Sequence, residues 1–139
     1  MKKFGILLLL SFMTSINSGM AQNKSTTQVQ KVKVYYFHPN ERCPIDQSIE
    51  ANARTVIQSF FQKEIKSGTL VFKVINTDEK ENASMITKFD INAQALYIVK
   101  LDKGKDIQKD ITRFAFDYGK SNPGKFKAGL KDEIEQALK

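Results

Sequence analysis

The sequence is poor in the residues of sulfur and metal chemistry, because its 139 residues include one cysteine and one histidine. A single cysteine cannot form an internal disulfide, so the domain must be stabilised by its hydrophobic core. One histidine and one cysteine are also too few for a zinc site, which usually takes three or four protein ligands. Cys43 is therefore inert, paired with another molecule, or a working thiol.

The amino-terminal apolar run is too short to span a bilayer, which takes about 20 apolar residues. It lies in MKKFGILLLLSFMTSINSGMAQ, between two lysines and a small-residue site that ends at Ala21. This build is typical of a secretory signal that is cleaved after Ala21. We therefore expect a periplasmic or secreted protein with no stable membrane span after cleavage, and a retained anchor is the alternative.

The chain has few acidic residues for its basic ones, with 15 Asp and Glu against 22 Lys and Arg, a formal net charge of +7. Loss of Lys2 and Lys3 with the signal lowers this charge to +5. The lysines are spread along the chain and mixed with acids, as in KDEIEQALK. A solvated surface explains this pattern, whereas nucleic-acid binding needs the charge on one face. We expect no nucleic-acid partner.

Removing 21 residues from the 139 leaves 118, which is enough for one compact domain with one core. The polar segment QNKSTTQVQ has no periodic apolar residues and indicates a flexible lead-in. The expected organisation is a signal peptide over residues 1–21, a lead-in over 22–31 and a single domain over 32–139.

Apolar patterning predicts four strands: KVKVYYF, TLVFKVIN, ALYIVKL and a short strand that includes Ile107 after a turn at Lys103-Gly104. A long helix is predicted to begin at Pro44 and to end near Ser67-Gly68. Its apolar stripe recurs every three or four residues, at Ile45, Ile49, Ala53, Val56 and Phe60.

Three shorter helical segments complete the prediction. Asp78 and Glu81 have the spacing of a capping box before a short helix marked by Ala83, Ile86 and Phe89. A second helical piece runs over residues 111–118. After a break at Asn122-Pro123-Gly124, the chain closes with a helix whose apolar positions are Phe126, Leu130, Ile134 and Leu138.

This order predicts an α/β fold with a central mixed four-stranded sheet and helices on both faces. The first three strands are joined through helices, so we expect them to be parallel. The hairpin at Lys103-Gly104 then adds an antiparallel edge.

The layout resembles the thioredoxin-like superfamily. YYFHPNERCPID stands where that family has a strand, a loop and a Cys-x-x-Cys motif at a helix start, and VINTDEKENASMITKFDINAQALYIV is similar to its next strand, helix and strand. YYFH followed by RCP is most similar to the exported bacterial nitrophenyl-compound nitroreductase subunits. The resemblance covers about Val32 to Leu138 and implies a thioredoxin-like fold with a site at Cys43.

Two positions depart from the family pattern. The second cysteine of the motif is Asp46, and the position of the cis-proline before the third strand is Ala95. Cis peptide bonds rarely form without proline, so the loop at Gln94-Ala95, which the resemblance places opposite the thiol, is expected to be trans. No acid occurs between Lys31 and Asn40, so the buried carboxylate of some thioredoxins has no counterpart.

The candidate site centres on Cys43, which Pro44 at the first helical position makes the N-cap residue. The helix terminus, Arg42 and a protonated His38 all favour a thiolate. Asp46 disfavours it, because it competes for the same N–H donors and repels a second negative charge. The competing structural interpretations are that Asp46 is an ordinary capping residue and Cys43 the remnant of a former active site.

Cofactor and metal signals are weak. We find no flavin or nicotinamide signature and expect no cofactor. His38 and Cys43 share a loop and could together hold a soft ion such as copper(I), although a surface histidine is the simpler interpretation. The aromatic run of Tyr35, Tyr36 and Phe37 indicates core and strand-edge residues rather than a stacking platform.

The sequence thus favours an exported thioredoxin-like accessory or binding protein with a single-cysteine site. A self-contained dithiol reductase is not expected, because resolving a mixed disulfide needs a second thiol. One alternative is a monothiol oxidoreductase that forms mixed disulfides with a protein partner through Cys43, and another is a soft metal or metalloid carrier.

Overall fold

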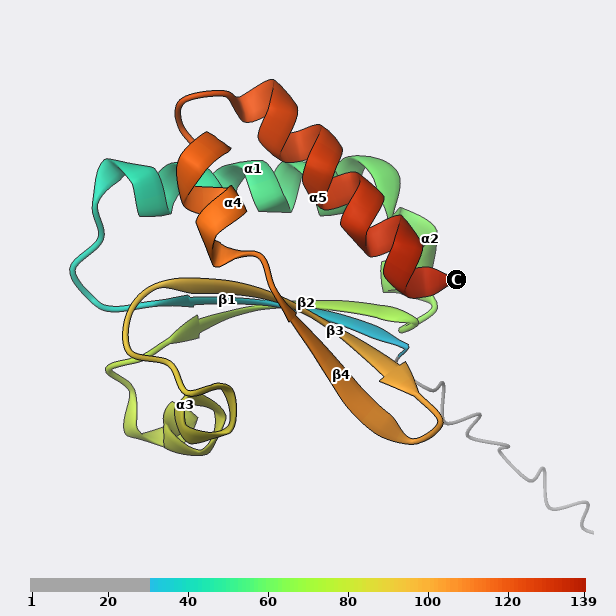
Figure 1. Cartoon of the computed structure of the whole chain (residues 1–139), viewed down its shortest axis with the longest axis horizontal. Coiled ribbons are helices and arrows are strands. Elements are labelled where there is room, and N and C mark those ends of the chain that lie inside the picture. The colour runs from blue at the N-terminus through green and yellow to red at the C-terminus, as the bar shows by residue number, and fades with distance from the viewer. Residues whose placement is uncertain (1–30) are drawn as a thin grey trace, which may run out of the picture.

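A computed structural model of the protein describes residues 31–139. The expected signal peptide and nearly all of the expected lead-in lie outside the described residues. The four strands form one mixed sheet in the order β2-β1-β3-β4, with helices on both faces (Figure 1). The predicted α/β class, with a central mixed four-stranded sheet and helices on both faces, is confirmed.

Strands and helices follow the predicted order. The strands are β1 (Val32–His38), β2 (Leu70–Asn76), β3 (Ala95–Asp102) and β4 (Lys105–Asp110). The helices are α1 (Pro44–Phe60), α2 (Gln62–Lys66), the 3-10 turn η1 (Lys80–Asn82), α3 (Ala83–Phe89), α4 (Thr112–Tyr118) and α5 (Pro123–Leu138).

The direction of β3 differs from the prediction. β1 and β2 are parallel as expected, but β3 runs antiparallel to β1, with Tyr35 opposite Tyr97. The reason is the length of α3. Its 7 residues rise about 10 Å, whereas β2 with 7 residues is about 23 Å long. The chain therefore does not return to the starting end of the sheet before β3 begins.

Each face of the sheet has its own apolar cluster. Helices α1, α2, α4 and α5 lie on one face and α3 lies on the other (Figure 1). On the first face, Tyr36 of β1 packs with Ile49 of α1 and Phe126 of α5. On the second face, Phe37 packs with Phe89 of α3. The strict alternation of side chains along β1 thus feeds both clusters.

The long predicted helix is interrupted. Phe61 leaves helical geometry (φ −124°, ψ 27°), which separates α1 from α2. Phe60, predicted to lie on the apolar stripe, is 56% exposed, whereas Phe61 is 3% exposed and belongs to the core. The backbone change at Phe61 turns its ring inward, so this residue takes the position expected of Phe60.

The capping box predicted at Asp78 and Glu81 is not formed. Asp78 does not cap a helix, because its carboxylate accepts the backbone N–H of Asn40 at 2.7 Å, and η1 begins two residues later.

At the turn between β3 and β4, Lys103 and Gly104 have φ of 48° and 79°. A two-residue hairpin with a type I′ turn requires positive φ at both central residues. The predicted turn is confirmed.

Candidate functional site at the start of the long helix

Cys43 is the N-cap residue of α1, as predicted, with extended backbone geometry (φ −83°, ψ 164°) and Pro44 at the first helical position. Its residue is exposed, and the thiol is free. The short loop from β1 thus presents one thiol to solvent at the amino end of a 17-residue helix. Unpaired N–H groups at that end favour negative charge nearby.

Asp46 occupies the interior of the same helix start. It has no exposed surface, although charged side chains are rarely buried so completely without partners. Its Oδ2 accepts the backbone N–H of Cys43 at 2.9 Å, which is the capping contact proposed from the sequence. The carboxylate therefore holds the loop to the helix start from a position three residues beyond the cysteine.

Two further side chains contact Asp46, one from the loop before β3 and one from β1. Gln94 donates its amide to Oδ2 at 3.2 Å. The Tyr36 hydroxyl donates to the backbone oxygen of Asp46 at 3.1 Å and lies 3.5 Å from Oδ1. Burial raises the pKa of Tyr36 well above its ordinary value of 10.0, and the Asp46 carboxylate raises it further. The phenol therefore remains a proton donor at any physiological pH.

Arg42 is held at the helix start by three contacts. Its guanidinium forms an ion pair with Glu50, lies 5.8 Å from the centre of the Tyr36 ring and donates to the backbone oxygen of Asp46 at 3.4 Å. Burial alone would raise the pKa of Glu50, but hydrogen bonds from Arg54 and Arg42 outweigh it and lower that pKa. Arg42 thus links the first turns of α1 to Tyr36 of β1.

The first half of the loop is fixed to the neighbouring strand. His38 at the end of β1 is half-buried, and its Nδ1 lies 2.9 Å from the carbonyl oxygen of Pro39. Asn40 accepts a hydrogen bond from Asn76 at 2.7 Å and donates its N–H to Asp78. Within residues 31–139, His38 makes no hydrogen bond to Cys43.

The loop before β3 meets the helix start through Gln94. The peptide bond between Gln94 and Ala95 is trans, as predicted, and Ala95 pairs with Phe37 of β1. A hollow of about 380 Å³ adjoins this loop, and Pro39, Ile86 and Gln94 are among the residues that line it. Asp46 thus joins the loop before α1 to the loop before β3.

The described part of the chain contains no cluster of three or more His, Cys, Asp or Glu side chains that could hold a metal ion. No helix within residues 31–139 combines the length and the apolar character needed to cross a membrane.

Sequence reasoning located Cys43 and Asp46 but missed the partners of the carboxylate. Tyr36 lies in the core, as the sequence indicates, but its hydrogen bond to Asp46 is missed, although a buried phenol usually finds a hydrogen-bond partner. The sequence indicates a position for Gln94 opposite the thiol, but it does not predict the hydrogen bond from its amide to Asp46. Glu50 could have been found from its spacing, because it precedes Arg54 by one helical turn.

Comparison with known proteins gives a likeness of fold alone. No protein-family model matches the chain, and no curated protein matches it. Among solved structures, Trxlp from Edwardsiella tarda EIB202 is 13% identical, with a TM-score of 0.49 over 74% of this chain and 84% of that chain. A malarial protein is 17% identical, with a TM-score of 0.41 over 59% of this chain and 82% of that chain.

Proposed function

We propose that this chain is an exported thioredoxin-like accessory or binding protein whose cysteine end contacts a protein partner without catalysing dithiol exchange. The sequence resemblance to the nitrophenyl-compound nitroreductase subunits supports this proposal. The observation that carries it is the complete burial of Asp46 at the position of the second cysteine.

The chemistry of the site supports a binding role. A thiolate can attack a disulfide and release one sulfur, but a second thiol must then attack the resulting mixed disulfide to free the protein. Asp46 cannot make that attack, and its hydrogen bonds to Cys43 and Gln94 hold it in the interior. The exposed end of α1 and the hollow beside Gln94 form a fixed surface to which a partner can bind.

A second candidate is a monothiol oxidoreductase, and the exposure of Cys43 favours it. In that case an outside thiol attacks the mixed disulfide, takes over the partner sulfur and returns Cys43 to its reduced form. The protein then needs no second cysteine of its own.

The test is to restore the missing thiol. We expect the wild type to reduce insulin in the presence of dithiothreitol no faster than Cys43→Ser. We expect Asp46→Cys to exceed both, because it supplies a resolving thiol in a Cys-Pro-Ile-Cys motif. Asp46→Ser is the matched control, since it removes the same carboxylate without adding a sulfur.

Two results would contradict the proposal. If the wild type reduced insulin as fast as Asp46→Cys, the chain would be a reductase despite its single cysteine. If Asp46→Cys were folded by circular dichroism but no more active than Asp46→Ser, the missing thiol would not be what limits the site.

A further inference from the structure

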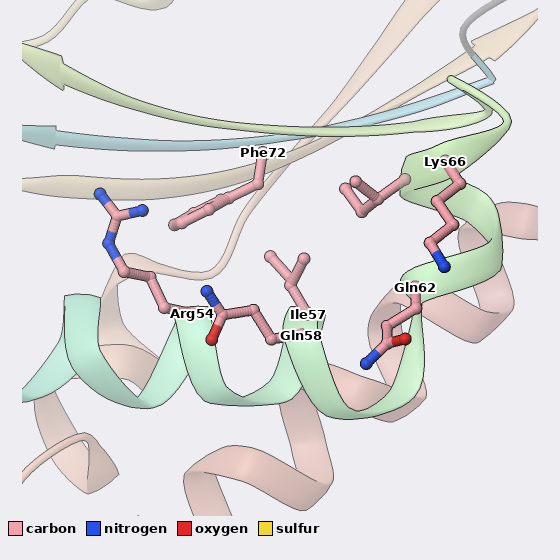
Figure 2. A pocket seen from close by; sticks show the side chains of 7 residues that line it. Arg54, Ile57, Gln58, Gln62, Lys66 and Phe72 are labelled. Atoms are coloured by element: carbon pink, nitrogen blue, oxygen red, sulfur yellow. The ribbon is translucent and has the colours of Figure 1, made fainter.

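A groove lined by α1, α2 and β2 lies beside an edge of the sheet that residues 31–139 leave unpaired. It has a volume of about 410 Å³, within the range of ligand sites in proteins. Its apolar residues are Ile57 of α1, Ile65 of α2 and Phe72 of β2. Figure 2 shows Ile57 and Phe72 facing each other, with Arg54 at one end of the groove and Lys66 at the other.

The strand that borders this groove is open to pairing. β2 is an edge strand, and its strand partner among residues 31–139 is β1. Its outer side therefore presents backbone N–H and C=O groups that another extended chain can bind. Peptides that add to such an edge gain affinity from the backbone and specificity from pockets for alternate side chains. The groove is placed to receive those side chains.

The positive charges on the two faces of the sheet at β2 favour a partner with acidic side chains. The residues that line the groove include two cations and no carboxylate. Arg54 pairs with Glu50, but Glu50 also pairs with Arg42, so two cations share one acid. On the opposite face of the sheet, the middle of β2 presents the exposed Lys73.

A second copy of the chain does not suit this edge. Two β2 strands that paired antiparallel over their full length would place Lys73 opposite Lys73, because it is the central residue of Leu70–Asn76. Like charges directly opposite each other destabilise a strand pair. A lysine in the middle of an edge strand is a common defence against self-association.

We propose that the edge of β2 binds an extended peptide segment of alternating apolar and acidic residues. The apolar side chains enter the groove between Ile57 and Phe72. The acidic side chains lie on the other face, where one of them pairs with Lys73. This surface is separate from the cysteine end, so the inference does not depend on the function proposed above, and Cys43→Ser should leave the binding unchanged.

The test uses the full chain and three labelled peptides, with binding measured by fluorescence anisotropy. The first peptide alternates glutamate with isoleucine over seven residues, the second replaces each glutamate with lysine, and the third has the first composition in two blocks. We expect the first to bind best. Lys73→Glu should weaken its binding about 2- to 30-fold and strengthen binding of the lysine peptide, since one cross-strand charge contact reverses its sign.

Lys120→Glu is the matched control, because it makes the same charge change at an exposed turn outside β2 and the groove. It should alter binding less than about twofold, as expected for a distant exposed charge in physiological salt. Backbone amide resonances of β2 should shift when the first peptide is added.

Four results would each overturn the proposal. They are no binding of the first peptide, equal binding of the block peptide, equal effects of Lys73→Glu and Lys120→Glu, or amide shifts that leave β2 unaffected. The second and third would mean that net charge alone attracts the peptide.

Discussion

Replacing Asp46 with alanine is expected to destabilise the protein more than any replacement of an exposed acid. The change removes the acceptor of two donors, the backbone N–H of Cys43 at 2.9 Å and the amide of Gln94 at 3.2 Å. It also removes a carboxylate that has no exposed surface. The loop, the helix start and the segment before β3 would then lose their common contact.

The size of the effect follows from two opposing contributions. Hydrogen bonds to a charged group contribute about 1.5–3 kcal/mol each, so two such bonds contribute about 3–6 kcal/mol. Removing the carboxylate also removes the cost of burying it, and this offsets several kcal/mol of the stability lost with the hydrogen bonds. We therefore expect a net loss of about 2 kcal/mol, similar to the larger effects of removing a helix cap. Native domains have only about 5–15 kcal/mol of stability in total.

Urea unfolding followed by circular dichroism measures this loss. With a denaturant slope of about 2 kcal/mol per molar, the unfolding midpoint of Asp46→Ala should fall by about 1 M. The control is Asp102→Ala, an exposed acid at the end of β3, which should change stability by no more than about 0.5 kcal/mol. If the two variants unfolded at the same urea concentration, Asp46 would not anchor the helix start.

Three further predictions concern packing and charge. Phe61→Ala should cost about 3–5 kcal/mol and Phe60→Ala less than about 1, by the same urea assay, and similar values would mean that the break in the helix is misplaced. Gly119→Ala should cost about 1–3 kcal/mol, because its Cβ would lie 2.5 Å from Cγ1 of Ile49; a melting temperature equal to that of the wild type would contradict this contact. The pKa of Glu50 is lowered from 4.5, so its ionised form stabilises the folded protein above pH 4.5, and this stabilisation is lost as the pH falls through the lowered pKa. Glu50→Gln should therefore flatten the dependence of stability on pH in that range. An unchanged pH dependence would refute the ion pairs.

Much of this fold could be predicted from local sequence, because apolar period and turn residues determine where each element lies. The valines and aromatics of Val32–His38 predicted strand β1, and Lys103-Gly104 predicted the turn between β3 and β4. The direction of β3 could not be obtained in this way. It depends on how far α3 carries the chain, and the sequence pattern located this helix without fixing its path across the sheet.

The candidate site was predictable in outline only. Cys43 and Pro44 form a local signal for a helix start, and the contact between Cys43 and Asp46 has the fixed spacing of a capping box. The contacts of Asp46 with Tyr36 and Gln94 join residues 10 and 48 positions apart. Such pairs depend on the register of β1 and β3, which local spacing does not contain.

The most direct measurement at the cysteine end is glutathione-driven reduction of hydroxyethyl disulfide by the wild type and by Cys43→Ser. Glutathione supplies the outside thiol that a monothiol enzyme requires. If the cysteine end is a binding surface, both proteins will give the rate of glutathione alone. A wild-type rate at least tenfold above that of Cys43→Ser would contradict the binding role and establish monothiol catalysis.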